Sequence, residues 1–176
     1  MLLRKINAGV SLITAFLLLD HAIFNAARMI SRGTIEKNGG FMSWILFVLM
    51  LIHAVISIGL AISAHSETEK RKCKSYSKLN VATLVQRISG VLLIIFAGLH
   101  VAGAAGFMTP PPIVHAILPA VFFSIALMHV AVSTSKAFIT LGIGNAKVVK
   151  AVDIVIKVIC VATLVAALIG FYIYKV

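Results

Sequence analysis

Residues 42–64 read MSWILFVLMLIHAVISIGLAISA, a run without a single Lys, Arg, Asp or Glu. A helix needs about 20 mostly apolar residues to cross a bilayer, because each residue adds only ~1.5 Å. The run is continuous rather than alternating, and an open sheet edge cannot face lipid, which excludes strands. This segment therefore predicts a transmembrane helix that carries one histidine, His53, near its middle.

Four further segments have the same character, at roughly 8–30, 82–106, 113–135 and 152–174. The chain is 61% hydrophobic and only 12% charged, so it has too little polar surface for a water-soluble fold of 176 residues. The segment at 8–30 is too long for a cleavable signal peptide, and no small-x-small cleavage site follows it. The sequence predicts an all-α integral membrane protein with five transmembrane helices and a single transmembrane domain over 1–176.

The net charge of +11 is distributed as a topology signal. Its cations concentrate at the N-terminus and in the connections after 42–64 and after 113–135 (Arg4, Lys5, Lys70, Arg71, Lys72, Lys74, Lys78, Lys136, Lys147, Lys150). The connection 108–112 carries none. We therefore expect a cell inner membrane protein with a cytoplasmic N-terminus and an outer C-terminus. A nucleic-acid partner is not expected, because no basic patch has interleaved aromatic residues.

Histidines inside the apolar segments point to a functional site. His21, His53, His100 and His129 lie one to a segment in the first four segments, and 152–174 has none. Ionisable side chains are costly in lipid, so they usually face the interior of a bundle and have a partner. A single histidine is more often hydrogen-bonded to a neighbouring helix than bound to a metal, but four in consecutive helices are harder to explain in that way. We expect a four-helix core with the helix at 152–174 outside it.

The depth of each histidine predicts how the four pair. His21 and His100 lie toward the outer side, whereas His53 and His129 lie nearer the middle and the cytoplasmic side. Two histidines from facing helices at one level are the arrangement that ligates a haem iron axially. The pairs His21/His100 and His53/His129 would stack two haems across the bilayer, or leave one if His53 lies at another depth.

Glycines follow the helix at 82–106, at positions 90, 98, 103 and 106. Small residues let helices approach closely, and they also leave space for a flat macrocycle. Both interpretations stay open from the sequence.

One local motif resembles a known family. Gln86-Arg87-Ile88-Ser89-Gly90-Val91 is similar to the His-Arg-x-Ser-Gly-Val motif of the cytochrome b membrane-anchor subunits of succinate dehydrogenase and fumarate reductase (succinate:quinone oxidoreductases). The order of the four histidines resembles the five-helix, di-haem type of that family. Gln86 stands where the family often has histidine.

The resemblance implies a function and a set of site residues. Such a chain anchors a flavoprotein subunit and an iron–sulfur subunit at the cytoplasmic face, and passes electrons between them and quinone through haem b. His21, His53, His100 and His129 would be the axial ligands. Gln86, Arg87 and Ser89 would bind quinone or a haem propionate. Dicarboxylate chemistry would belong to the partner chains, so the chain would not be an enzyme by itself.

The remaining polar residues have plainer expectations. Asp20, beside His21, is expected to be structural or a second-layer partner, or to take up protons. His65 and His115 lie at segment ends and are expected at the interface. Asp153 and Lys157 are spaced as an i,i+4 pair.

Two alternatives to this function stay open. Another bis-histidine cytochrome b, of the hydrogenase or formate dehydrogenase type, would use the same residues. A haem-free transporter or assembly factor would use the histidines for protons or a metal. The sequence shows no nucleotide-binding loop and no Ser-His-Asp or Cys-x-x-Cys arrangement that would indicate a self-contained enzyme.

Overall fold

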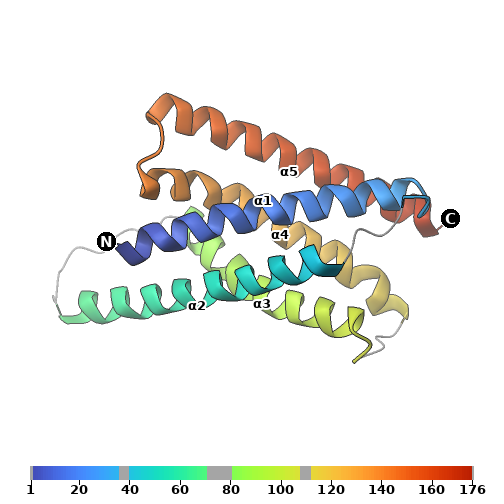
Figure 1. Cartoon of the computed structure of the whole chain (residues 1–176), viewed down its shortest axis with the longest axis horizontal. Helices are drawn as coiled ribbons and strands as arrows, with labels where there is room; N and C mark the ends of the chain where they lie inside the picture. Colours follow the sequence, from blue (N-terminus) through green and yellow to red (C-terminus); the bar gives the residue numbers. More distant parts are fainter. Residues whose placement is uncertain (1, 36–39, 71–80, 108–111, 176) are drawn as a thin grey trace.

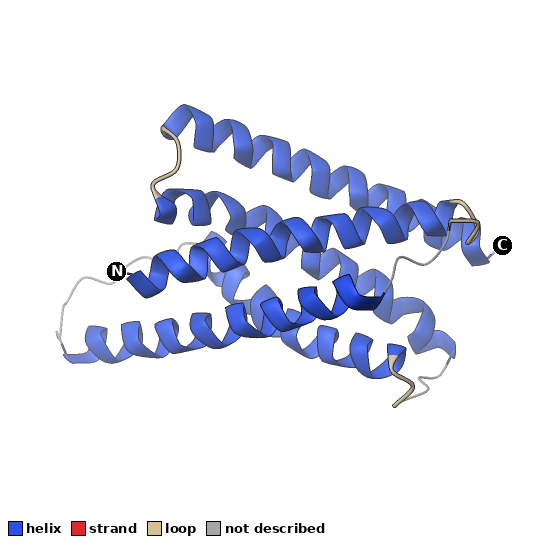
Figure 2. Ribbon diagram, in the orientation of Figure 1, coloured by secondary structure: helices blue, strands red, loops and turns tan. Residues whose placement is uncertain are grey.

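The computed structural model describes residues 2–35, 40–70, 81–107 and 112–175, without the side chains of 64–70, 104, 112–117 and 174–175. Its helices, in chain order, are α1 (Leu2–Ile30), α2 (Gly40–Lys70), α3 (Val81–Ala104), α4 (Pro112–Leu141) and α5 (Ala146–Lys175) (Figures 1 and 2). No strand occurs in this described part of the chain. All five helices are long and apolar enough to cross a membrane. The predicted all-α, five-helix membrane fold is confirmed.

The helices extend beyond the apolar segments that predicted them. α1 begins at Leu2 rather than near residue 8, and α4 continues to Leu141 rather than ending near 135. Lys136 was therefore wrongly expected in a connection, because it lies inside α4. Lys147 and Lys150 likewise lie in the first turns of α5. Hydropathy marks only the part of a helix in hydrocarbon, whereas a helix can continue into the interface, where Lys side chains reach water.

Several expected features fall outside the description. The Lys-rich connection at 71–78 and the connection at 108–111 lie outside the described residues, as do the side chains of His65 and His115.

Helix ends are set by residues that leave the α conformation. At the end of α3 the Phe107 N–H donates to the Ala102 carbonyl (2.9 Å), and Gly106 has φ +77°. Gly142 ends α4 in the same way, with φ +73°. A left-handed residue at this position satisfies the last carbonyls of a helix and reverses the chain, and glycine adopts it without steric cost. Asn145 then begins α5, because its side-chain oxygen accepts from the Val148 N–H at 3.0 Å.

Four helices form an open square and the fifth lies outside it. α1 packs against α2 and α4, α4 packs against α3, and α2 barely touches α3. α5 packs in the groove between α1 and α4 (Figure 1) and contributes Cys160 to the buried core, so the core is not made by the first four helices alone as expected. No Cα of α1 lies within 8 Å of one in α3, and none of α2 within 8 Å of one in α4, among the residues described. α1/α3 and α2/α4 are therefore the diagonals of the square.

The chain ends divide the molecule into two sides. The start of α1, the end of α2, the start of α3 and the α4–α5 turn lie at one end of the bundle, which we call the N-side (Figure 1). The end of α1, the start of α2 and the C-terminus lie at the other end, the C-side.

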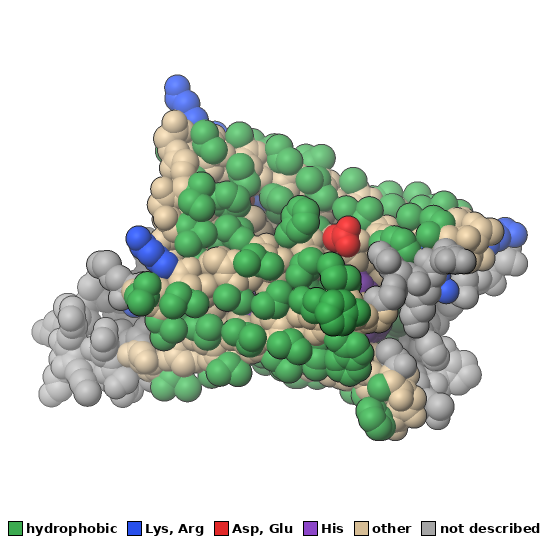
Figure 3. Space-filling view, viewed as in Figure 1, with side chains coloured by type: hydrophobic (Ala, Val, Ile, Leu, Met, Phe, Trp, Pro, Cys, Tyr) green, Lys and Arg blue, Asp and Glu red, His purple; other side chains and the backbone are tan. Residues whose placement is uncertain are grey.

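The tightest packing lies away from the square. The buried core consists of Leu19, Leu127, Val130 and Cys160, from α1, α4 and α5. Of the α2 side chains that the structure describes, only Leu46 is buried. The outer surface is covered by apolar side chains (Figure 3), as lipid-facing helices require. The buried core of the described chain is thus formed by α1, α4 and α5, and α2 and α3 pack mainly on α1 and α4.

Candidate functional site

The four intramembrane histidines lie on opposite corners of the square, close enough to act on each other electrostatically in two groups. His21 of α1 interacts electrostatically with His100 of α3, and His53 of α2 with His129 of α4. The pairing of these residues as ligands, expected from their depth along the helices, stays a prediction. Adjacent packed helices are about 8–10 Å apart, so partners on a diagonal are separated by a wider space. Each pair therefore faces across the middle of the bundle rather than along a helix–helix contact.

The two pairs lie at different depths. His129 contacts α3 at Gly90, and His100 follows ten residues later on α3, which is about 15 Å along the helix. On the other side, Asn7 contacts Ser57 of α2, and His21 lies 14 residues beyond Asn7, about 21 Å. His53 lies one helical turn closer to His21 than Ser57 does. The separation of His53 and His21 along the bundle axis is therefore also about 15 Å. The His53/His129 pair is nearer the N-side and the His21/His100 pair nearer the C-side.

The Ser89 hydroxyl contacts the ring of His129. Its oxygen lies 2.7 Å from the Val85 carbonyl and 2.9 Å from His129 Nδ1. When the hydroxyl donates its one proton to the Val85 carbonyl, its oxygen accepts from Nδ1–H of His129, and the lone pair of the ring is on Nε2. A ring nitrogen held in this way is the usual outer support of a histidine ligand. Ser89 is fully buried, and it supports His129 instead of reaching a quinone.

His53 is held less completely. Its Nδ1 atom is buried and has no hydrogen-bond partner, although the backbone of Asn7 lies beside the ring. The Asn7 amide donates to Ser57 Oγ at 3.0 Å, one turn from His53, and so fixes α1 against α2 at this level.

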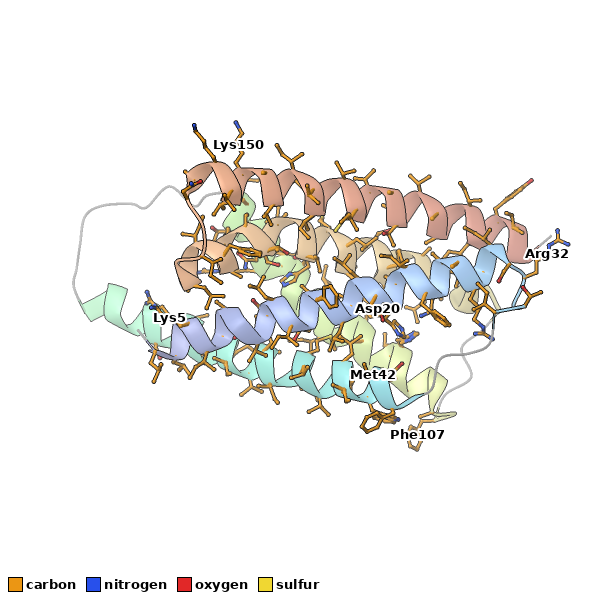
Figure 4. All side chains as sticks on the ribbon, turned by 45° about the horizontal axis from the view of Figure 1, so that its top comes forward. Lys5, Asp20, Arg32, Met42, Phe107 and Lys150 are labelled. Carbon is orange, nitrogen blue, oxygen red and sulfur yellow. The ribbon has the colours of Figure 1, made fainter. Side chains whose placement is uncertain are left out.

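The C-side pair has a more open environment. The ring of His100 stacks at a tilt of 33° on Phe122 of α4, with ring centroids 5.4 Å apart. His100 is exposed and His21 half-buried. A small area of histidine surface is visible in Figure 3, toward the C-side. Asp20 is exposed on α1 (Figure 4) and interacts electrostatically with His21, but it makes no ion pair with Arg28.

Residues 86 and 87 belong to a polar group at the N-side. Lys136 Nζ donates to Gln86 Oε1 at 2.7 Å and to Thr83 Oγ1 at 3.2 Å. Arg87 is exposed and lies close enough for its charge to act on Lys136. Gln86 and Arg87 were expected here from the motif. Lys136 was missed because it was placed in a connection.

Polar side chains form a stripe along one face of α1. This stripe is the sequence signal that could have located the α1 residues near the histidines. At intervals of three, four or seven residues, α1 carries polar side chains that share one face (Asn7, Ser11, Thr14, His21, Asn25, Arg28). Ser11, Thr14 and Asn25 bond to carbonyls of their own helix. The others lie along the face that includes His21. Such a stripe in an otherwise apolar helix indicates an interior with polar content.

The glycines of α3 have different surroundings, since Gly90 lies against His129 whereas Gly98 and Gly103 are exposed. A Cβ on Gly90 would lie 3.3 Å from Cε1 of His129, so the imidazole rests directly on the α3 backbone. Gly98 and Gly103, which flank His100 in sequence, have no atom within 4 Å of an added Cβ. They are therefore not sites of close helix packing. Gly106 belongs to the turn after α3 and not to the site.

The donor set fits a haem better than a structural metal ion. Among the described residues, no three side chains of His, Cys, Asp or Glu converge. A zinc site usually takes three or four protein ligands, whereas a haem iron takes its last two ligands from the protein. Two histidines facing each other, one with its Nε2 lone pair free, satisfy the second requirement.

One further hollow lies elsewhere. A cavity of about 540 Å³ opens where α4 turns into α5, lined by Ser135, Lys150 and Asp153 among others. No histidine lines it. Asp153 is held by Lys157 at 2.5 Å, the expected i,i+4 pair.

Comparison of the chain with protein-family models, with curated proteins and with solved structures found no match.

Proposed function

We propose that this chain is a membrane-embedded electron-transfer subunit that binds two haem b groups. The observation that carries the proposal is the pairing of four histidines across the two diagonals of one helix square. His21 and His100 would be the axial ligands of the haem nearer the C-side. His53 and His129 would be those of the haem nearer the N-side. When bound, each haem supplies a one-electron carrier at its own depth in the bilayer.

The residues around the histidines serve the same purpose. Ser89 keeps the lone pair of His129 on Nε2, and the Asn7–Ser57 bond holds α2 at the height that His53 requires. Phe122 orients the ring of His100. The apolar outer surface excludes water from the square, which prevents the ligands from exchanging freely with solvent.

The quinone site is proposed at the N-side. Arg87, Gln86 and Lys136 supply hydrogen-bond donors at the membrane surface, and quinone carbonyls accept such bonds. Ser89 is left out of this site because it is buried against His129. The Lys and Arg residues at the N-side ends of α1, α4 and α5 support an orientation in which the N-side faces the cytoplasm from a cell inner membrane.

The partners are proposed from the Arg87-Ile88-Ser89-Gly90 stretch. Its resemblance to the anchors of succinate dehydrogenase and fumarate reductase supports an iron–sulfur subunit and a flavoprotein subunit at the cytoplasmic face. A hydrogenase- or formate dehydrogenase-type cytochrome b would use the same histidine pairs with another soluble partner.

The test is to purify the chain together with the proteins that accompany it in its native membrane. The reduced-minus-oxidised absorption spectrum gives the ratio of haem b to polypeptide. We expect a ratio near two, and bound flavin and iron–sulfur centres in the accompanying chains. A ratio near one would remove one pair, and a folded complex without haem would refute the function. Hydrogenase or formate dehydrogenase subunits in place of a dicarboxylate-oxidising flavoprotein would refute the succinate dehydrogenase assignment.

A further inference from the structure

Arg28 has a buried donor that nothing in the described chain satisfies. It lies in the last turn of α1, and its Nε atom is buried without a hydrogen-bond partner. A buried charged donor without a partner is unfavourable, more so within a membrane. Arg28 belongs to the polar face of α1 that carries His21, seven residues earlier.

Lys136 occupies the matching position on α4. It follows His129 by seven residues, and it bonds only to the neutral oxygens of Gln86 and Thr83. Neutral acceptors satisfy its hydrogens but not its charge. Of the two acidic side chains that the structure describes, Asp153 is bound to Lys157, and Asp20 bonds to neither Arg28 nor Lys136.

The two spacings place each cation relative to a histidine pair. Seven residues are almost two turns, so each cation shares a helix face with its histidine and lies about 10 Å from it along the axis. α1 runs from the N-side to the C-side, and α4 runs in the opposite direction (Figure 1). Arg28 is therefore displaced from His21 toward the C-side surface, and Lys136 from His129 toward the N-side surface. Each pair has one cation between it and the nearer membrane surface.

The geometry points to a ligand with two anionic groups at one edge. We propose that Arg28 and Lys136 bind the propionate carboxylates of the haems at His21/His100 and His53/His129, so that the two haems turn these edges to opposite membrane surfaces. This rests on the proposed function. Carboxylates are the only charged groups at the edge of a haem, and a cation beside them forms a charge-assisted hydrogen bond with them. A lipid phosphate is the other anion with this chemistry, and the test separates the two.

The pairing has an electrochemical consequence for each haem. A compensated carboxylate contributes little negative charge near the iron. If the cation is removed, the carboxylate charge favours the ferric state, and the midpoint potential of that haem falls. The effect is local, because the histidine pairs are about 15 Å apart along the helices. Each cation should therefore affect one haem.

The experiment is a potentiometric titration of the purified complex, followed by the haem absorption band, for Arg28→Gln and Lys136→Gln. We expect Arg28→Gln to lower the potential of one haem and Lys136→Gln to lower that of the other. Arg28→Lys, which keeps the charge, should restore a potential close to that of the unaltered chain. Arg32→Gln and Lys150→Gln are matched controls, since both side chains are exposed and point away from the bundle in Figure 4.

Each outcome decides between distinct claims. If both haems are present and neither potential moves more than in the controls, the propionate assignment is overturned and the proposed function stands. If the potentials are unchanged but Arg28→Gln loses tightly bound phospholipid phosphorus, the anion is a lipid phosphate, which also overturns it. If the unaltered complex contains no haem, the proposed function itself fails. If Arg28→Gln does not assemble, Arg28→Lys takes its place in the test. A fall in midpoint potential in Arg28→Lys as large as the fall in Lys136→Gln would then contradict the role of charge.

Discussion

Replacing Ser89 with alanine should weaken one haem site and leave the other intact. The change removes the acceptor for Nδ1–H of His129 in a fully buried position. An unsatisfied buried donor costs about 1–3 kcal/mol. Loss of an outer partner of a metal-bound histidine typically reduces metal affinity about 10- to 100-fold. That range corresponds to about 1.4–2.8 kcal/mol, so two independent arguments give the same size of effect.

The assay is competition with an excess of a haem-scavenging protein. The haem b to polypeptide ratio should fall from near two to near one for Ser89→Ala under conditions in which the unaltered chain keeps both haems. The matched control is Ser133→Ala, because the Ser133 hydroxyl donates to the His129 carbonyl at 2.6 Å and does not touch the ring. Equal haem retention in the two variants would refute the role of Ser89 in holding the ligand. Thermal unfolding of both variants verifies that neither loses its fold.

The other substitutions test the packing and the pairing directly. Gly90→Ala places a Cβ 3.3 Å from the imidazole of His129, so the ring must shift by a few tenths of an ångström. The absorption band of one haem should therefore change. Gly98→Ala, whose Cβ would lie in open space, should leave the bands of both haems unchanged. His21→Ala and His100→Ala should each reduce the haem ratio to near one and leave identical remaining spectra, whereas different remaining spectra would disprove the pairing. Gly170→Ala brings a Cβ to 2.8 Å from a side-chain carbon of α1, and overpacking of this kind costs about 1–3 kcal/mol. Its unfolding temperature should fall with both haems retained, and an unchanged temperature would contradict the close α1–α5 contact.

The apolar segments were sufficient to predict five helices, because lipid imposes length and composition on any spanning helix. They did not predict where helices end, since Lys136 lies within α4 and bonds to Gln86. Depth along a helix follows from a constant rise, so counting residues predicts which histidines share a level, and their pairing as ligands stays a prediction.

Rotation of one helix against another could not be predicted in the same way. The contacts of Ser89 with His129 and of Asn7 with Ser57 depend on which faces of α3 and α4, or of α1 and α2, meet. Nearly every face of these helices is apolar, so hydropathy does not distinguish the inner face from the lipid-facing one. Polar spacing on α1 was the one available guide, and it would have identified Asn7 and Arg28 as inward-facing.

The buried core of α1, α4 and α5 bears on biogenesis. Leu19, Leu127, Val130 and Cys160 pack with one another, and Gly170 brings α5 onto α1. α2 and α3 each rest mainly on one neighbour, α1 or α4, and barely meet each other. Under the proposed function, the polypeptide would insert and assemble before haem binds, and the seam between α2 and α3 would be the side from which haem arrives through the lipid. Haem shortage in the cell should then leave an inserted, protease-resistant apoprotein instead of a degraded one.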